Sequence, residues 1–323
     1  MKAAHLAVVT PKRCGLYETT REVVKALRDR GVDSRLVDPT DNKLHPGGDD
    51  DRGAKFGSMD WAVTADVIVN HSGYDGTLVA KTDQPIVHVV HGRPLSSFKG
   101  EAAGSTPIYS YHYRRNTDPR WRSVVTFWKE HEDYLKVMLP DKPVHVVQGC
   151  VDLDAWTPQG PSGYTFGGKG GAINVVCSDA FRADVDPFVP LNTFALWARE
   201  HQGAKLHLYG KSPQYKKGWD AIIQRITDDG NMGECMGWVN GLEHVYRAAD
   251  VVLSAHEIEV RTIKEAMASG CPVAQLSSLR PELIDEALET VDARAQAVAR
   301  WNPTETARQF HIILAQACHS KPG

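Results

Sequence analysis

The stretch ADVVLSAHEIEVRTIKEAMASGCPVA, residues 249–274, decides the fold class of this chain. It begins with a Val-rich apolar run of strand length at 249–255 and continues into a helix-forming segment at 262–269. Gly270 then ends the expected helix, and a second apolar segment starts at Cys271-Pro272-Val273. This order predicts a βαβ step with a tight turn from strand to helix, which is the building unit of a parallel sheet.

Two glutamates frame the turn of this step. Glu257 stands at the expected strand exit and Glu265 lies inside the expected helix. In open α/β sheets, ligands bind beyond the carboxyl ends of the strands, and the N–H groups at a helix start attract phosphate. Eight residues of helix would separate the two glutamates by about 12 Å, more than the about 5–9.5 Å that paired glycosidase carboxylates need. We therefore expect the two carboxylates to bracket a diphosphate.

Length, charge and cysteine usage narrow the class of protein. The 323 residues exceed a typical single core, so we expect two domains. A net charge of −3 gives no global electrostatic argument for binding nucleic acid or an anionic membrane. We find no signal-peptide pattern and no apolar run of about 18 residues, and we expect a cytoplasmic protein without stable membrane insertion. The six cysteines are widely spaced and form no C-x-x-C pair, so reduced thiols are expected.

Short Val- and Ile-rich runs alternate with helical segments along the chain, which predicts α/β folding with parallel sheets and helices on both faces. The expected strands are residues 5–9, 34–37, 67–70, 86–90, 173–177, 205–209, 251–253 and 272–275. Residues 124–147 are expected to form a strand, a helix and a further strand. The stretch GPSGYTFGGKGG at 160–171 is the best linker candidate. It is not a Walker phosphate loop, because Gly and not Ser or Thr follows Lys169.

Residues 249–274 resemble the E-x7-E signature of the family-4 retaining glycosyltransferases, which have the GT-B fold. Glu257 and Glu265 occupy the two Glu positions, and residues 265–273 match the family's EAMA-x-G-x-PV. Upstream, the VYRAADV stretch at 245–251 is similar to the family's approach to this strand. The resemblance implies two Rossmann-like domains facing each other across a cleft. It also implies retaining transfer of a hexosyl or related sugar from a nucleotide-sugar donor.

The resemblance also sets the expected domains. Residues 1–158 would form an N-terminal Rossmann-like acceptor domain, and residues 172–300 a C-terminal nucleotide-sugar domain. Residues 159–171 would link them. Residues 301–323 are similar to the final family helix, which packs back on the N-terminal domain. The segment between Gln275 and Trp301 departs from the family, because it is short and lacks a glycine-rich turn.

For binding the ribose, the sugar and the phosphates of the donor, the resemblance implies four residues. Glu265 would hold the ribose hydroxyls, and Glu257 would act near the donor sugar. His91, at the end of the expected strand 86–90, would contact that sugar as a second catalytic residue. Gly15 would let the loop after the first strand approach the phosphates, and a simple turn glycine is the alternative.

Cationic residues are needed where charge accumulates on the leaving diphosphate. Arg182 stands where the family has its phosphate-binding Arg, but Pro187 replaces the Lys that follows it. Lys211 and Arg261, the latter next to Thr262, are the candidate substitutes for donor binding. For Lys211 and Arg261 a solvated turn residue is the alternative. The resemblance implies neither a metal nor a cofactor, since helix amides and cations can stabilise the diphosphate.

Residues 108–121 are rich in aromatic and basic side chains, in the domain that would receive the acceptor. Aromatic rings stack on sugars or bases and arginines bind anions, so Tyr111, Arg114 and Arg115 are candidate acceptor residues. The alternative is a partly buried aromatic strand with surface arginines. The acceptor could be a glycan, a small molecule or modified DNA, and an anionic acceptor is one hypothesis.

Other functions stay open at this stage. One is a DNA-modifying glycosyltransferase acting on a hydroxylated base. Another is a non-catalytic nucleotide-binding protein with the GT-B fold, which Pro187 makes a real alternative. A sugar-phosphate epimerase or a phosphorylase could share the same two-domain architecture.

Overall fold

A computed structural model describes residues 1–7, 15–38, 55–71, 83–91, 118–161, 164–167, 170–178, 188–210, 219–237, 239–256 and 258–320. The chain divides into two compact units. The first contains Met1–Cys150 together with Trp301–Gly323, and the second contains Val151–Arg300. The C-terminal segment therefore belongs to the first unit.

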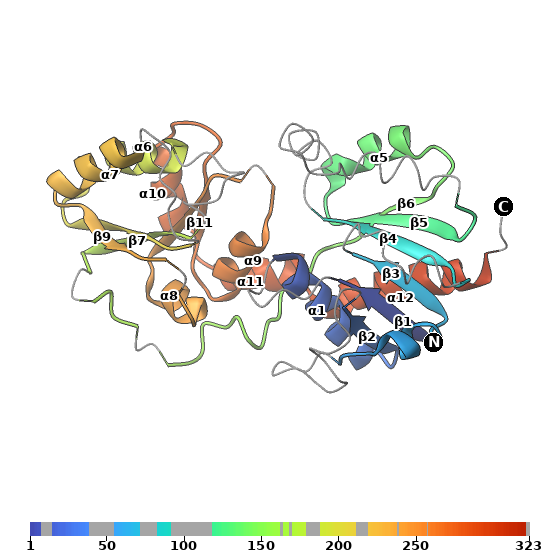
Figure 1. Cartoon of the computed structure of the whole chain (residues 1–323). Coiled ribbons are helices and arrows are strands. Elements are labelled where there is room, and N and C mark those ends of the chain that lie inside the picture. The colour runs from blue at the N-terminus through green and yellow to red at the C-terminus, as the bar shows by residue number, and fades with distance from the viewer. Residues whose placement is uncertain are drawn as a thin grey trace. The chain divides into compact units, whose positions relative to one another are not determined.

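The first unit is built on a six-stranded sheet with the order β2-β1-β3-β4-β5-β6 (Figure 1). Its strands are β1 (Lys2–Leu6), β2 (Asp33–Val37), β3 (Val67–Asn70), β4 (Ile86–Val90), β5 (Trp121–Thr126) and β6 (Val144–Val146). Each neighbouring pair is parallel. The strand order reverses between β1 and β3, so the topological switch point of this sheet lies at the carboxyl ends of these two strands.

Helices cover both faces of this sheet. They are α1 (Gly15–Asp29), α2 (Met59–Ala62), the 3₁₀ helix η2 (Lys129–His131), α5 (Glu132–Met138) and α12 (Pro303–His319). On one face, α1 and α12 contact each other and bury Val23, Leu27, Phe310 and Leu314 against the strands. The α2 and α5 helices pack on the other face. The hydrophobic core of the first unit therefore includes side chains from α12, near the C-terminus.

The second unit has a five-stranded sheet with the order β11-β10-β7-β8-β9, again with parallel pairs only. The strands are β7 (Ile173–Cys177), β8 (Ala204–Leu208), β9 (Met232–Cys235), β10 (Val251–Ser254) and β11 (Val273–Gln275). This is the order of a doubly wound nucleotide-binding sheet, with its switch point between β7 and β10.

Helices lie on both faces of this second sheet as well (Figure 1). They are α6 (Phe188–Trp197), α7 (Trp219–Asp228), α8 (Leu242–Ala248), α9 (Arg261–Ala268), α10 (Glu282–Leu288) and α11 (Ala293–Arg300). The α6, α7 and α10 helices bury Phe194, Ile226 and Ile284 in one core with the strands. The α9 helix contacts α8 and α11 on the opposite side. All of the residues of this core come from the second unit.

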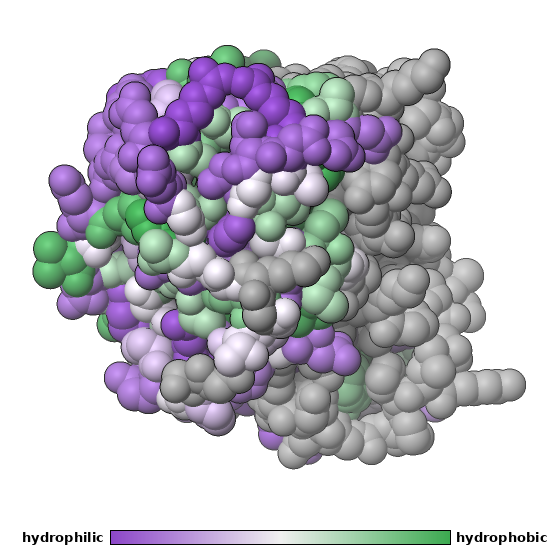
Figure 2. All heavy atoms as spheres, turned by 90° about the vertical axis from the view of Figure 1, so that its left-hand side faces the viewer, coloured by the Kyte–Doolittle hydropathy of each residue, from purple (hydrophilic) through white to green (hydrophobic). Residues whose placement is uncertain are grey.

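The surface of the second unit is mixed in character. On the face that Figure 2 shows, hydrophilic residues surround smaller hydrophobic patches. Within the described part of the chain, none of the helices combines the length and apolar character that a membrane span requires.

The strand β9 was not predicted from the sequence. Its residues, Met232-Gly233-Glu234-Cys235, contain neither an apolar run nor a strict alternation. Glu234 is buried nonetheless, and one of its carboxylate oxygens accepts hydrogen bonds from the hydroxyls of Tyr164 and Tyr209. Tyr164 belongs to the expected linker, so part of that segment is held against the edge of this sheet.

Candidate functional site

The switch point of the second unit is formed by β7 and β10, which pair from Val251 opposite Val175 onward. Ser178 follows β7 directly, and its buried hydroxyl lies 2.9 Å from that of Tyr246 in α8. The α9 helix begins after the turn that follows β10. The carboxyl ends of these strands therefore place the start of α9 where open α/β sheets bind ligands.

Arg261 and Glu265 form the polar centre of this site. Nε of Arg261 makes an ion pair with Oε1 of Glu265, one helical turn later, and the two side chains are only 15% and 8% exposed. Arg261 is the first residue of α9, where a cation opposes the helix dipole. The helix dipole therefore does not explain why an arginine stands here. Two roles would explain it: orienting the buried carboxylate of Glu265 and attracting an anion to the start of the helix.

The turn before α9 is held by neighbouring elements. Arg300, the last residue of α11, makes an ion pair with Glu259 in the turn. The side-chain amide of Gln275, at the end of β11, donates to the carbonyl of His256. The backbone of the turn is thus fastened to two other elements of the same unit, which gives the site a preformed shape.

Arg294 of α11 fastens the other end of α9. Its guanidinium donates to the carbonyl of Ala268 at 2.6 Å and to that of Leu153 at 2.9 Å. Burial lowers the pKa of Arg294 from its ordinary value. The helix that carries Arg261 and Glu265 is therefore fixed at both ends.

A row of three histidines crosses the sheet of the first unit. His5 lies in β1, His71 follows β3 and His91 follows β4. Nδ1 of His5 lies 2.9 Å from Nε2 of His71, and Nδ1 of His71 lies 2.9 Å from Nε2 of His91. The register pairs His5 with Val69, so His71, two residues further along, points to the same face. The row starts at the switch point between β1 and β3.

Burial keeps two of these three histidines, His5 and His71, uncharged. His5 is fully buried and His71 nearly so. Burial lowers the pKa of His5 from 6.5 to about 3. Burial, with the added effect of the neighbouring histidines, also holds the pKa of His71 well below its ordinary value. Both rings are therefore neutral at pH 7, and each has one N–H donor and one acceptor nitrogen.

His88 points away from this row, because it pairs with Asn70, whose side chain faces the opposite side of the sheet from that of His71. It is buried, and its ring packs edge-on against Trp121 with centroids 5.7 Å apart. The ring of His91 instead lies 5.5 Å from that of Phe127, on the face covered by α1 and α12. His88 therefore packs in the protein interior.

The remaining predicted site residues fall into two groups. Gly15 is the first residue of α1, with open space where a side chain would begin, and Thr262 follows Arg261 as the second residue of α9. The others lie outside the described residues: Glu257, Arg182, Lys211, Tyr111, Arg114 and Arg115. His5 and His71 were missed by the sequence reasoning, although both stand in or directly after strand-like runs of the kind that flank His91.

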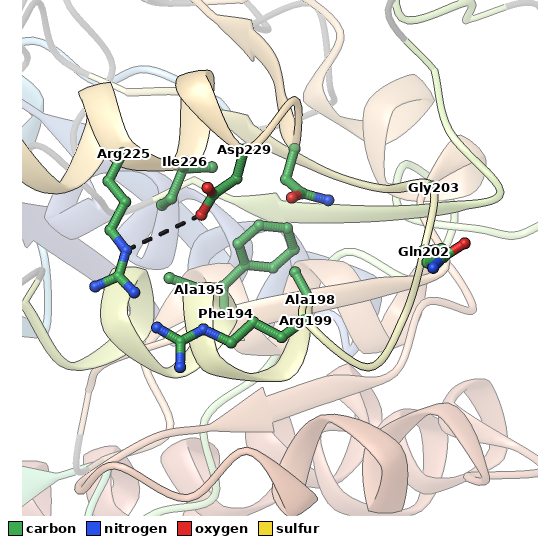
Figure 3. A pocket seen from close by; sticks show the side chains of 10 residues that line it. Phe194, Ala195, Ala198, Arg199, Gln202, Gly203, Arg225, Ile226 and Asp229 are labelled. Carbon is green, nitrogen blue, oxygen red and sulfur yellow. Dashed lines mark ion pairs between the residues drawn. The ribbon is translucent and has the colours of Figure 1, made fainter.

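A pocket of about 430 Å³ lies elsewhere on the second unit, against α6 and α7 (Figure 3). Phe194 and Ile226 form its apolar part, and Arg225 and Asp229 make an ion pair at its rim with a separation of 4.0 Å. Gly203, also in its wall, stands directly before β8. The pocket is therefore at the amino-terminal edge of the sheet, opposite to the switch point.

The described residues also bear on metal and thiol chemistry. Among them, no group of three or more His, Cys, Asp or Glu side chains is arranged to hold a metal ion. The described cysteines, Cys150, Cys177, Cys235, Cys271 and Cys318, are free thiols.

The fold can be compared with known proteins. No family model and no curated protein matches this chain. HepE from Anabaena, solved in complex with UDP-glucose, has a TM-score of 0.67 and 13% identity over 98% of this chain and 100% of its own. Sucrose-phosphate synthase from Thermosynechococcus elongatus has a TM-score of 0.67 and 14% identity over 98% of each chain. A glycosyltransferase from Rickettsia africae has a TM-score of 0.64 and 12% identity over 99% of each chain. This chain therefore has the GT-B fold, as the sequence predicted.

Proposed function

We propose that this protein is a glycosyltransferase that moves a sugar from a nucleotide-sugar donor to an acceptor with retention of the anomeric configuration. The observation that carries the proposal is the buried pair of Arg261 and Glu265 at the start of α9, beside the switch point of the second sheet. Two proteins of the same fold support it: HepE was solved in complex with UDP-glucose, and the protein from Rickettsia africae is named a glycosyltransferase.

The chemistry of this pair fits a nucleotide. An ionised carboxylate only accepts hydrogen bonds, and a ribose offers two neighbouring hydroxyl donors, so Glu265 would hold the ribose. Arg261 orients that carboxylate and adds positive charge at the helix start. The first amides of α9, near Thr262, would receive the diphosphate, because N–H groups at a helix start have no partner within the helix.

The residues that would contact the donor sugar, the leaving diphosphate and the acceptor are assigned from the sequence. Glu257 and His91 would contact the donor sugar, while Arg182 and Lys211 would neutralise the leaving diphosphate. The acceptor would attack on the face from which the diphosphate leaves, with the leaving phosphate assisting its deprotonation and no metal required. The acceptor residues would be Tyr111, Arg114 and Arg115, which favours an anionic acceptor.

A melting experiment tests donor binding. The protein is heated with UDP, GDP, ADP or TDP and with their sugar conjugates, beginning with UDP-glucose. We expect one nucleotide to raise the melting temperature, since a ligand at 100 times its Kd stabilises the native state by about 2.7 kcal/mol. Glu265→Gln should lose most of this shift when each variant is compared with and without ligand. Glutamine keeps the shape of the side chain but not its charge.

The matched control is Glu282→Gln. Glu282 lies in α10 of the same unit and is paired with Arg280 on the surface, so its removal should leave the ligand shift unchanged. The absence of any shift in the unmodified protein would overturn the proposal. An equal shift in Glu265→Gln would show that Glu265 does not hold the ribose. Release of nucleoside diphosphate from the bound sugar conjugate then separates an enzyme from a non-catalytic binding protein.

A further inference from the structure

The row His5–His71–His91 restricts how its protons can be placed. His71 uses both ring nitrogens, Nε2 toward His5 and Nδ1 toward His91. Each neutral ring has one N–H, so the hydrogen bonds must all run in one direction along the row. Either His5 donates to His71 and His71 to His91, or both bonds are reversed.

The buried end of the row distinguishes these two arrangements. Nε2 of His5 is buried and has no hydrogen-bond partner among the described residues. If the bonds run from His91 toward His5, this nitrogen carries an N–H that donates to nothing. If they run from His5 toward His91, it is an unprotonated acceptor. Orphaned buried N–H groups are rarer in proteins than unpaired acceptors, so the second direction is favoured.

This direction determines the state of His91. When Nδ1 of His71 carries the proton and donates it, Nε2 of His91 accepts, and the proton of a neutral His91 is on Nδ1. We propose that His71 is a positioning residue that fixes His91 as the Nδ1–H tautomer, so that His91 meets the sugar of the donor as a hydrogen-bond donor. The second half of this statement rests on the proposed function, whereas the tautomer itself does not.

The row fixes the tautomer of His91 and does not conduct protons to solvent. A path needs an exit, and within the described residues the inner end of the row stops at a fully buried ring. Burial keeps His5 and His71 neutral, so neither stores a proton for the reaction. What the row supplies is a fixed orientation and a fixed donor at His91, at no cost of reorganisation when substrate binds.

Nuclear magnetic resonance of the ¹⁵N-labelled protein tests the tautomer directly. Long-range correlations distinguish a protonated from an unprotonated ring nitrogen, and the spectrum of His91→Gln assigns the signals of His91. At pH 7.5 without ligand, we expect Nδ1 of His91 to be protonated and Nε2 to be unprotonated. The opposite pattern overturns the proposal, whatever the protein binds.

Two amide variants separate the two contacts of His71. His71→Asn keeps an N–H near the Nδ1 position, toward His91, whereas His71→Gln places its amide near the Nε2 position, toward His5. We expect His71→Asn to preserve the Nδ1–H tautomer and most of the activity. His71→Gln should no longer fix His91 as the Nδ1–H tautomer. It should lower the rate of nucleoside diphosphate release by roughly 10- to 100-fold, by analogy with residues that orient metal-binding histidines.

The control is His88→Gln, on the opposite face of β4. His88 is a buried histidine of the same strand that packs against Trp121, so its loss is expected to lower stability without changing the tautomer of His91. A His71→Gln protein that keeps the Nδ1–H tautomer would overturn the role of His71. The protein could show the expected tautomers and yet bind no nucleotide sugar. That result would support the role of His71 and overturn only the proposed function.

Discussion

Arg261 occupies the first position of a helix, where a positive charge is locally unfavourable. Its partner Glu265 is a carboxylate with only 8% of its side chain exposed. Removing one member of a buried ion pair leaves the other without compensation, which costs more than the net contribution of the pair itself. At the residue scale, the candidate site is therefore also a point where stability and binding are coupled.

Replacing Arg261 by Met measures this coupling. The substitution keeps an unbranched stem and removes the charge, so it leaves the carboxylate of Glu265 without this ion pair. We expect the free energy of unfolding to fall by about 3 kcal/mol, as measured by urea denaturation. The nucleotide-dependent shift in melting temperature should fall as well.

Arg280→Met provides the comparison. Arg280 makes an ion pair with Glu282, but both side chains are about half exposed. Exposed pairs contribute little, so a change within about 0.5 kcal/mol is expected. Equal losses of unfolding free energy in the two variants would mean that the ion pair of Arg261 and Glu265 contributes no more than an exposed one.

The last helix shows what local sequence determines at the scale of an element. Asn302 caps α12, because its side-chain oxygen accepts the N–H of Thr304 at 2.9 Å, and Pro303 stands at the first position of the helix. The docking of α12 is tertiary: Thr306 donates to the carbonyl of Gln148 at 2.8 Å.

Asn302→Ala tests the cap. It removes the acceptor for an N–H at the helix start and is expected to lower stability by about 1 kcal/mol, seen as a lower thermal midpoint. Asn302→Asp and Asn302→Ser retain an oxygen acceptor, so both should remain near the unmodified protein. Similar losses in all three variants would show that the side chain acts through packing and not through the cap.

The strand β9 shows what local sequence leaves undetermined. Two of its four residues are a glycine and a glutamate, which local propensity does not place in a strand. It forms because β8 offers a free parallel edge and because Tyr164 and Tyr209 satisfy the buried carboxylate of Glu234. Those two tyrosines are distant in the sequence, so a local pattern contains no sign of them.

At the scale of the whole molecule, the two cores differ in how they are assembled. The core of the second unit comes entirely from residues 151–300. The core of the first unit needs residues from both ends of the chain, because α12 supplies Phe310, Ile313 and Leu314. The two units should therefore differ in their ability to fold when separated.

Fragments of the chain test this difference. Residues 151–300 should fold alone and melt cooperatively by circular dichroism. Residues 1–150 should not, because they lack α12, one of the two helices that cover one face of their sheet. Joining residues 1–150 to 301–323 through a short Gly-Ser linker should restore a cooperative transition. A cooperative transition in residues 1–150 alone would show that α12 is dispensable for the first core.

By itself, the sequence determined the α/β class, the strands β3, β4 and β7, and the turn and helix of residues 249–274, as well as the GT-B fold that they predicted. These features depend on short-range periodicity and turn chemistry, which are properties of residues close together in the sequence. Only the tertiary structure decided β9, the pairing of Glu234 and the row from His5 to His91. His5 and His71 are 66 residues apart, and only the register of parallel strands brings their side chains to the same face of one sheet.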